Sequence, residues 1–285
     1  MRNTESLKKF ERKLQLWNYS PRTIQTYSAA LRQMFRYLDK DSYRISNQDI
    51  ERYFEYKILQ CKGSRAMHDQ LINAVVKYFQ IIHNRKLNEL VIKRPRKEKR
   101  QVVVLTKNEI SKILSKIDNK KHHAVINTIY SLGLRISEVI NLSIDDIDSY
   151  AMVVYIRQAK GAKDRQVPLP EYLLYELREY YKQYRPKYYL FEGQTGDKYS
   201  TTSISNILKR AVLKSKINKQ VSVHTLRHSY ATHLMNANVN HQLISEILGH
   251  KNIKTTMRYS HVTTESYNVI DFNNALSNSN NLKIA

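Results

Sequence analysis

Residues 224–234 read HTLRHSYATHL, and apolar residues recur there at helical spacing, which predicts a helix from His224 to Met235. His224 and Arg227 are three positions apart, so they share one face of that helix. An HxxR pair alone is common by chance. The pair becomes informative only together with other segments of the chain.

Three further segments carry polar residues suited to chemistry. Residues 132–142 read LGLRISEVINL, residues 158–169 read QAKGAKDRQVPL, and residues 248–262 read LGHKNIKTTMRYSHV. Each has an ordinary explanation by itself: a surface ion pair, a solvated turn, a histidine at a helix end, or a packed tyrosine. Those explanations would have to hold for all four segments at once, and therefore we favour an active site.

The surrounding sequence predicts a mainly α-helical protein. Gly and Pro are sparse, at 6 and 5 residues, and apolar residues recur at helical spacing through most of the chain. Ser20-Pro21, Ser46 with Asp49, and Ser64 are helix-start signals, so we expect a four-helix unit that includes a short helix before Ser20.

Later in the chain, Thr106 and Glu109 form a capping box at the start of another helix, and a further helix is expected to end near Gly133. The other expected helices are Tyr172–Tyr184, Ser203–Lys214, His224–Met235 and His241–Leu248. A small β-sheet interrupts them. Met152–Arg157 and Gln166–Leu169 are the strand candidates, and AKGAKDR between them predicts a β-hairpin tip.

The composition indicates which class of partner the protein binds. Lys and Arg outnumber Asp and Glu by 48 to 25, for a formal charge of +23, which indicates a polyanionic partner such as nucleic acid, or less readily an anionic membrane. No run of 18 apolar residues and no signal-like N-terminal stretch is found, so we expect a soluble, cytoplasmic protein without a membrane partner. The single cysteine, Cys61, excludes an intrachain disulfide and argues against a structural zinc site.

Taken together, the four segments resemble the tyrosine recombinase (phage integrase) family in order, spacing and residue type, over essentially the whole chain. The greatest similarity is to Xer-type and small mobile-element recombinases. The resemblance implies an N-terminal helical core-binding domain, a SAM-like integrase bundle, followed by a C-terminal catalytic domain. We place these domains at residues 1–92 and 105–264, with a basic linker at 93–104 and a tail at 265–285 that docks on a neighbouring protomer.

The resemblance also implies a role for each motif residue. Two arginines clamp the scissile phosphate, a hairpin lysine is the general acid, two histidines flank the phosphate, one acidic residue orients His224 or an arginine, and one tyrosine is the nucleophile. In that order, these residues are Arg135 and Arg227, Lys160, His224 and His250, Glu138, and Tyr259.

Phosphodiester chemistry explains these residue types. Negative charge grows on the non-bridging oxygens during displacement, and fixed guanidinium groups stabilise it. The tyrosyl oxygen must lose a proton as it attacks, and the leaving 5′ oxygen must gain one. The phosphotyrosine ester conserves the energy of the bond, so neither a nucleotide cofactor nor a metal is expected.

Several neighbouring residues are assigned plainer roles. We predict that Arg165 contacts phosphate, and that His228, His233 and His241 serve helix packing or phosphate contacts. His261 is left open between orienting Tyr259 and contacting phosphate.

The resemblance further implies a homotetramer on two specific double-stranded DNA sites, a Holliday junction between two rounds of strand exchange, and in some systems an accessory protein. Two other functions remain open. A type IB topoisomerase would use similar chemistry to relax supercoils, and a non-catalytic DNA-binding regulator would need only the charge and the helices. The DNA target, and the choice among dimer resolution, integration, transposition and inversion, do not follow from the sequence.

Overall fold

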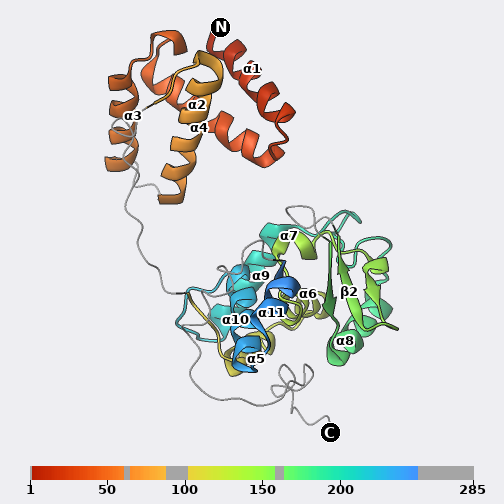
Figure 1. The fold of residues 1–285 in the computed structure, drawn as a ribbon. Coiled ribbons are helices and arrows are strands. Elements are labelled where there is room, and N and C mark those ends of the chain that lie inside the picture. Colours follow the sequence, from red (N-terminus) through yellow and green to blue (C-terminus); the bar gives the residue numbers. More distant parts are fainter. Residues whose placement is uncertain (1, 61–64, 88–101, 158–163, 250–285) are drawn as a thin grey trace. The chain divides into compact units, whose positions relative to one another are not determined.

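A computed structural model describes residues 2–60, 65–87, 102–157 and 164–249 of the chain. The chain folds into two compact units, residues 1–99 and 100–285, each with its own hydrophobic core (Figure 1). Among the described residues, helices dominate and the sheet is small, which confirms the predicted fold class. None of the described helices is long and apolar enough to cross a membrane.

The first unit is a helical bundle whose start signals are as predicted. Its elements are α1 (Arg2–Leu16), α2 (Pro21–Leu38), a 3-10 turn η1 (Ser42–Arg44), α3 (Asn47–Leu59) and α4 (Arg65–His83). The Ser20 hydroxyl caps α2 by accepting the N–H of Thr23, and Ser46 with Asp49 forms the expected capping box of α3. Ser64, the predicted start of the last helix, lies outside the described residues.

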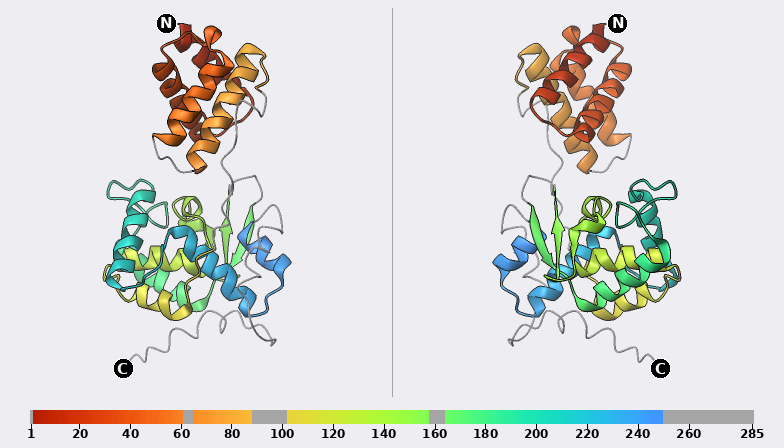
Figure 2. Two further views of the ribbon diagram at one scale, coloured as in Figure 1. Left: turned by 90° about the vertical axis from the view of Figure 1, so that its left-hand side faces the viewer. Right: turned by 90° about the vertical axis from the view of Figure 1, so that its right-hand side faces the viewer.

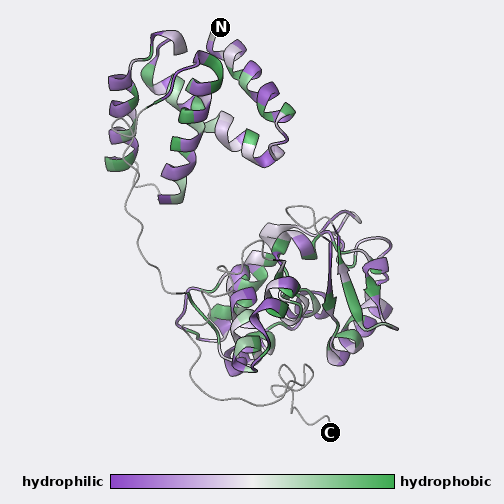
Figure 3. Cartoon of the chain, in the orientation of Figure 1, coloured by the Kyte–Doolittle hydropathy of each residue, from purple (hydrophilic) through white to green (hydrophobic). Residues whose placement is uncertain are grey.

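The core of this unit is built from apolar residues of its helices, and Figure 3 shows hydrophobic and hydrophilic residues alternating along these helices. Phe10, Phe35 and Phe79 pack edge-on around Tyr78, with ring centroids 5.3 to 5.5 Å apart. The buried Tyr78 hydroxyl has a hydrogen-bond partner in Ser6, at 2.7 Å. The hydroxyl at the centre of this aromatic cluster is therefore paired.

The second unit surrounds a buried helix. Its helical elements are α5 (Lys107–Leu114), α6 (Lys120–Ser131), α7 (Ile136–Val139), the 3-10 turn η2 (Ile144–Asp146), α8 (Glu171–Tyr184), α9 (Thr201–Lys214), α10 (Val223–Asn236) and α11 (His241–Leu248). The predicted capping box of Thr106 and Glu109 is present at the start of α5. Every residue of α6 from 124 to 131 is buried, because α8, α9 and α10 pack around it.

The sheet is antiparallel in the order β1 (Ile147–Asp148), β2 (Val153–Ile156) and β3 (Arg165–Pro168). β2 and β3 confirm the two predicted strands, whereas the two-residue β1 was not predicted. Val154 pairs with Val167 and both are fully buried, so one face of the sheet joins the core. Figure 2 shows α11 beside this sheet, where it contacts β3. The predicted hairpin tip lies mostly within residues 158–163, which are outside the described residues.

Most of the predicted linker, at residues 93–101, also lies outside them. Its end does not: Val102 packs on the core of the second unit, and Leu105 is fully buried there. The Leu105 N–H donates to the Ser229 hydroxyl in α10 at 2.9 Å. The segment that leads into α5 is thus fixed to the same helix that carries the HxxR pair.

Candidate active site

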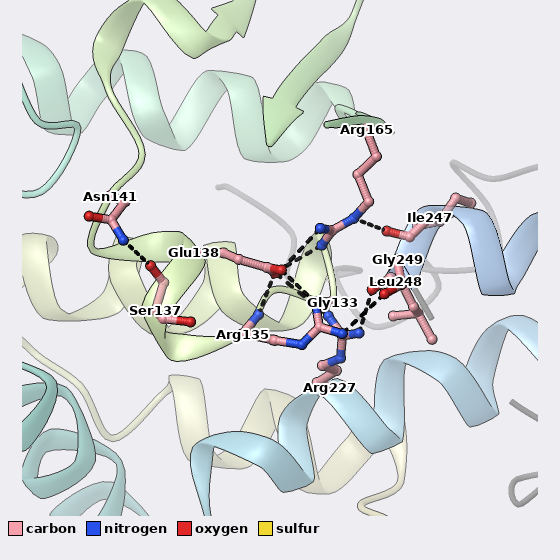
Figure 4. Close-up of polar contacts among 10 residues, drawn as sticks. All are labelled: Gly133, Arg135, Ser137, Glu138, Asn141, Arg165, Arg227, Ile247, Leu248 and Gly249. Carbon is pink, nitrogen blue, oxygen red and sulfur yellow. Dashed lines mark hydrogen bonds and ion pairs between the residues drawn. The ribbon is translucent and has the colours of Figure 1, made fainter. Parts of the chain in front are cut away.

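Three arginines from different elements of the second unit converge on one carboxylate (Figure 4). Arg135 immediately precedes α7, Arg165 is the first residue of β3, and Arg227 lies in α10. Glu138 projects from α7 into the space between them. Segments that are distant in sequence therefore meet at one point.

Glu138 accepts hydrogen bonds from two of these arginines. The Arg135 side chain donates Nη1 to Oε1 at 2.6 Å, and its backbone N–H donates to Oε2 at 2.8 Å. Arg165 binds both carboxylate oxygens, at 3.0 and 2.8 Å. Arg227 Nη1 stands 3.7 Å from Oε2 and forms an ion pair with it. The carboxylate thus sets the spacing of three guanidinium groups.

The same three arginines also hold the C-terminal end of α11. Arg165 Nε donates to the carbonyl of Ile247 at 2.6 Å, and Arg227 Nη2 donates to that of Leu248 at 2.5 Å. Arg135 Nη2 donates to the carbonyl of Gly249 at 3.2 Å. The last carbonyls of a helix lack intrahelical partners and carry its negative dipole end, so cations stabilise them.

Two glycines make this approach possible. Gly133 has φ +59°, and its carbonyl accepts Arg227 Nη1 at 2.7 Å. A Cβ at this position would stand 2.4 Å from Cδ1 of the buried Tyr230 ring, which leaves no room for a side chain. Gly249 ends α11 with φ +61°, and a Cβ there would stand 3.1 Å from Arg165 Nη1.

Burial and charge act against each other at Glu138. Burial raises the pKa of this carboxyl, but the hydrogen bonds and charge of Arg165, the N–H of Arg135 and the charge of Arg227 outweigh it and lower the pKa to about 2. Glu138 is therefore ionised at neutral pH. Its single negative charge still leaves two of the three guanidinium charges uncompensated within this group of four side chains.

The arginines differ in how much solvent reaches them. The Arg227 side chain is 1% exposed and that of Arg165 is 8% exposed, while that of Arg135 is 27% exposed. An excess of positive charge in a partly dry site favours an anion with several oxygens. A phosphate group has this chemistry.

His224 lies beside the arginines in the first turn of α10, with its side chain exposed. Although solvent reaches the ring, the surrounding protein partly desolvates it, and this desolvation together with the charges of Arg227 and Arg135 lowers its pKa and favours the neutral imidazole. Its ring packs edge-on against His228, with centroids 4.2 Å apart. Burial, His224 and Arg227 lower the pKa of His228 to about 4.

His233, further along α10, packs in the interior of the second unit. His233 is buried in α10, and its Nδ1 is 2.8 Å from the hydroxyl of Tyr130 in α6. This agrees with the predicted packing role. Within the described residues, no group of three or more metal-ligating side chains is found.

The structure brings together four of the predicted site residues: Arg135, Glu138, His224 and Arg227. Lys160, His250 and Tyr259 lie outside the described residues, as does His261. In the structure, the Arg165 guanidinium is buried against Glu138 and α11, and the prediction that it contacts phosphate stays a prediction. The sequence contains a signal for this burial, because strand alternation places Arg165 on the same face as the apolar Val167.

Two family models match the chain. One is the phage integrase family, over residues 103–266, and the other is the SAM-like N-terminal domain of phage integrases, over residues 7–89. In sequence, the chain is similar to the tyrosine recombinase XerA of Thermococcus kodakarensis, with 34% identity over 271 residues that cover 92% of each protein.

Two solved structures show the same fold. The XerH site-specific recombinase, in a post-cleavage complex with a palindromic difH substrate, matches with a TM-score of 0.71 and 22% identity, over 90% of this chain and 80% of that one. A lambda integrase tetramer bound to a Holliday junction matches with a TM-score of 0.76 and 16% identity, over 94% and 80%. Both likenesses extend over most of the chain.

Proposed function

This chain belongs to the phage integrase family of tyrosine recombinases, and from that premise we propose that it cuts and rejoins double-stranded DNA at a specific site through a covalent link between Tyr259 and a 3′ phosphate. The observation that supports the proposal is that Arg135, Arg227 and His224 lie together, and that Glu138 compensates only part of the positive charge of the arginines.

In this proposal, Arg135 and Arg227 hold the scissile phosphate. Glu138 and the α11 carbonyls already fix both guanidinium groups, so little reorganisation is needed when charge grows on the non-bridging oxygens. Arginine stays charged at every step, which suits a clamp and not a proton carrier.

His224 has the properties of a proton acceptor. Its lowered pKa favours the neutral form, and its exposed position in the first turn of α10 leaves the ring accessible to a bound phosphate or to the attacking tyrosine. We assign it the proton of Tyr259, or a hydrogen bond to a non-bridging oxygen.

Three assignments rest on the family motif alone. Tyr259 is the nucleophile, Lys160 protonates the leaving 5′ oxygen, and His250 binds a non-bridging oxygen. Because the ester to Tyr259 keeps the energy of the broken bond, rejoining uses neither a nucleotide cofactor nor a metal.

We also propose that four copies act on two DNA sites and pass through a Holliday junction. The lambda integrase of similar fold is a tetramer on such a junction, and XerH is bound to its difH substrate. The charge of +23 fits a DNA partner. The place of action is the cytoplasm, and an accessory protein is compatible with this scheme.

A trapped adduct tests the chemistry. The preferred site is first selected from a library of random-sequence duplexes by capture of their covalent complex with the wild-type protein. A nicked duplex that carries this site is then the substrate. With this duplex, the wild-type protein should form an adduct that survives denaturation, and Tyr259→Phe should form none. An adduct that persists in Tyr259→Phe would refute the assignment of the nucleophile.

A second substrate tests the general acid. Replacing the bridging 5′ oxygen by sulfur gives a leaving group that needs little protonation, so Lys160→Ala should cleave it at close to the wild-type rate. If Lys160→Ala stays slow on the sulfur substrate, Lys160 has another role.

Four-way junctions formed from two duplexes would distinguish recombination from topoisomerase-like relaxation, which yields none.

A further inference from the structure

The geometry points to Arg165 as a positioning residue for cleavage: it holds Glu138 and the end of α11 in the arrangement that aims Arg135 and Arg227 at the phosphate. This inference rests on the proposed function. It assigns Arg165 no contact with DNA, and it deepens the account of the site by naming what keeps the two clamping arginines in place.

Arg165 joins two elements through one planar group. Its Nη1 and Nη2 form a paired contact with both oxygens of Glu138, while Nε points the other way, to the carbonyl of Ile247 at 2.6 Å. Only a guanidinium has donors along both edges in a fixed plane. Each of the three guanidinium nitrogens of Arg165 therefore already donates to Glu138 or to Ile247.

The paired contact fixes the plane of the Glu138 carboxylate. Each oxygen of that carboxylate also serves a clamping arginine: Oε1 accepts from Arg135, and Oε2 lies 3.7 Å from Arg227. Without Arg165, the carboxylate could rotate toward either of these arginines and draw its guanidinium away from the phosphate. Arg165 therefore acts on both through Glu138.

The contact with Ile247 extends the same control to α11. Gly249 follows this helix, and a Cβ on Gly249 would stand 3.2 Å from Arg165 Cδ, so the two residues are packed closely. In sequence, the chain continues from Gly249 to His250 and, ten residues after Gly249, to Tyr259. Arg165 thus fixes the point from which the proposed nucleophile segment begins.

Positioning and phosphate contact predict opposite results for Arg165→Gln. If Arg165 positions the clamp, the single-turnover rate of adduct formation at saturating DNA should fall by about 100-fold, because small misplacements of reacting groups have effects of this size. The dissociation constant for the selected duplex and its salt dependence should stay unchanged. If Arg165 contacts phosphate, the affinity for the duplex should fall, and the slope of log affinity against log salt concentration should decrease by about 1. The rate at saturating DNA should then stay at the wild-type value, and this result would overturn the inference.

Two companion variants make the result specific. Arg157→Gln removes the same charge from the residue that follows β2. Arg157 pairs with Asp146 and its side chain is 62% exposed, so this variant should cleave at the wild-type rate once saturated. Arg165→Lys keeps the charge but lacks the planar group that pairs with both oxygens of Glu138 while a third nitrogen donates to Ile247, so it should be slow as well. It also carries the test if Arg165→Gln does not fold, as judged by circular dichroism.

A double variant tests the route through Glu138. If Arg165 acts by holding Glu138, then Arg165→Gln combined with Glu138→Gln should be no slower than the slower single variant. Rate losses that multiply would overturn that route. The Tyr259→Phe control separates the two levels: if it forms no adduct while Arg165→Gln cleaves normally, the proposed function stands and only this inference fails.

Discussion

Two helices of this chain, α3 and α7, begin with the same contact: a carboxylate in the first turn accepts the backbone N–H of the residue before the helix. In α3, the Asp49 carboxylate accepts the backbone N–H of Ser46 at 3.0 Å, and in α7 the Glu138 carboxylate accepts that of Arg135 at 2.8 Å. Both carboxyls have a pKa of about 2. For Asp49, the first causes are the hydrogen bond from Lys40 and that from Ser46, and for Glu138 burial is overcome by Arg165, Arg135 and Arg227.

The difference lies in what each helix gives up. The Ser46 hydroxyl in turn accepts a hydrogen bond from the N–H of Asp49 at 3.1 Å, which completes a capping box. Arg135 has no acceptor in its side chain and cannot return one. The short helix α7 therefore loses half of its cap to place a guanidinium, and this kind of local conflict marks functional sites.

The ion pairs differ in the same way. The Lys40 side chain is 46% exposed, so its pair with Asp49 is screened by water and adds little to stability. The arginines around Glu138 are mostly removed from water, and there the loss of one partner leaves the others as uncompensated buried charges. Regions that look alike in sequence therefore depend on their carboxylates to very different degrees.

Glu138→Gln should show the largest effect. Removing this negative charge leaves three guanidinium groups without a compensating charge and replaces one acceptor oxygen by a donor, and we expect a loss of about 3 to 5 kcal/mol in the free energy of unfolding of the second unit. Circular dichroism during urea denaturation measures this loss. Trp17, the only tryptophan in the chain, reports the first unit by fluorescence and should be unaffected.

Asp49→Asn is the matched control, with an expected loss of about 1 kcal/mol in the first unit, typical of a weakened helix cap. If the two variants lost equal amounts, the distinction between a capping carboxylate and a site carboxylate would be wrong.

Gly133→Ala should follow in size. The substitution puts a Cβ at 2.4 Å from the Tyr230 ring and requires φ +59° of a residue that avoids it, so we expect a loss of about 2 to 4 kcal/mol. The carbonyl that accepts Arg227 would shift, and adduct formation should slow as well. Gly196→Ala is the control: φ is +82° there but nothing lies within 4 Å of the added Cβ, so only about 1 kcal/mol should be lost. Equal losses in thermal or urea unfolding would show that the Tyr230 contact is unimportant.

Much of the fold was predictable because its signals are local. The caps at Ser20, Ser46 and Thr106 and the periodicity of the long helices depend on neighbours within a few residues, and the structure confirms them. β1 was missed, because a two-residue strand has no periodicity and exists only through its pairing with β2.

The site was predictable in its residue types but not in its connections. The motif residues Arg135 and Arg227 could be singled out from the sequence, whereas the contacts of Arg165 could not, because its partners lie 27 and 82 residues away in the chain. The three carbonyls at the end of α11 carry no side-chain signal at all. Such contacts become visible only once β3, α7, α10 and α11 are packed together.

An acid titration sharpens the comparison further. Burial and the charge of Lys107 lower the pKa of His233 to about 4, below its unfolded value of 6.5. The unfolded chain therefore takes up the proton first, so the stability from neutral His233 is complete above pH 6.5 and is lost as the pH falls to 4. That loss amounts to about 3 kcal/mol. The carboxyls of Asp49 and Glu138, with pKa values of about 2, contribute until lower pH.

Urea denaturation between pH 7 and 4 measures this dependence. His233→Gln should reduce it by the share of that residue while keeping a polar group near the Tyr130 hydroxyl, and the remainder belongs chiefly to His228, whose pKa is also about 4. A wild-type slope that survives in His233→Gln would assign the acid sensitivity to another group.

Ser46→Ala should have the smallest effect. It removes the hydroxyl that caps α3 but leaves Asp49 and Lys40 paired, so we expect a loss of about 1 kcal/mol, read from Trp17 fluorescence during denaturation. Thr106→Ala removes the equivalent cap of α5 and should cause a loss of similar size in the second unit. Both variants should form the DNA adduct at the wild-type rate once saturated, since neither hydroxyl contacts an arginine of the site. A slower adduct in Ser46→Ala would mean that the cap of α3 also serves cleavage, and the contrast with Glu138 would then be one of degree.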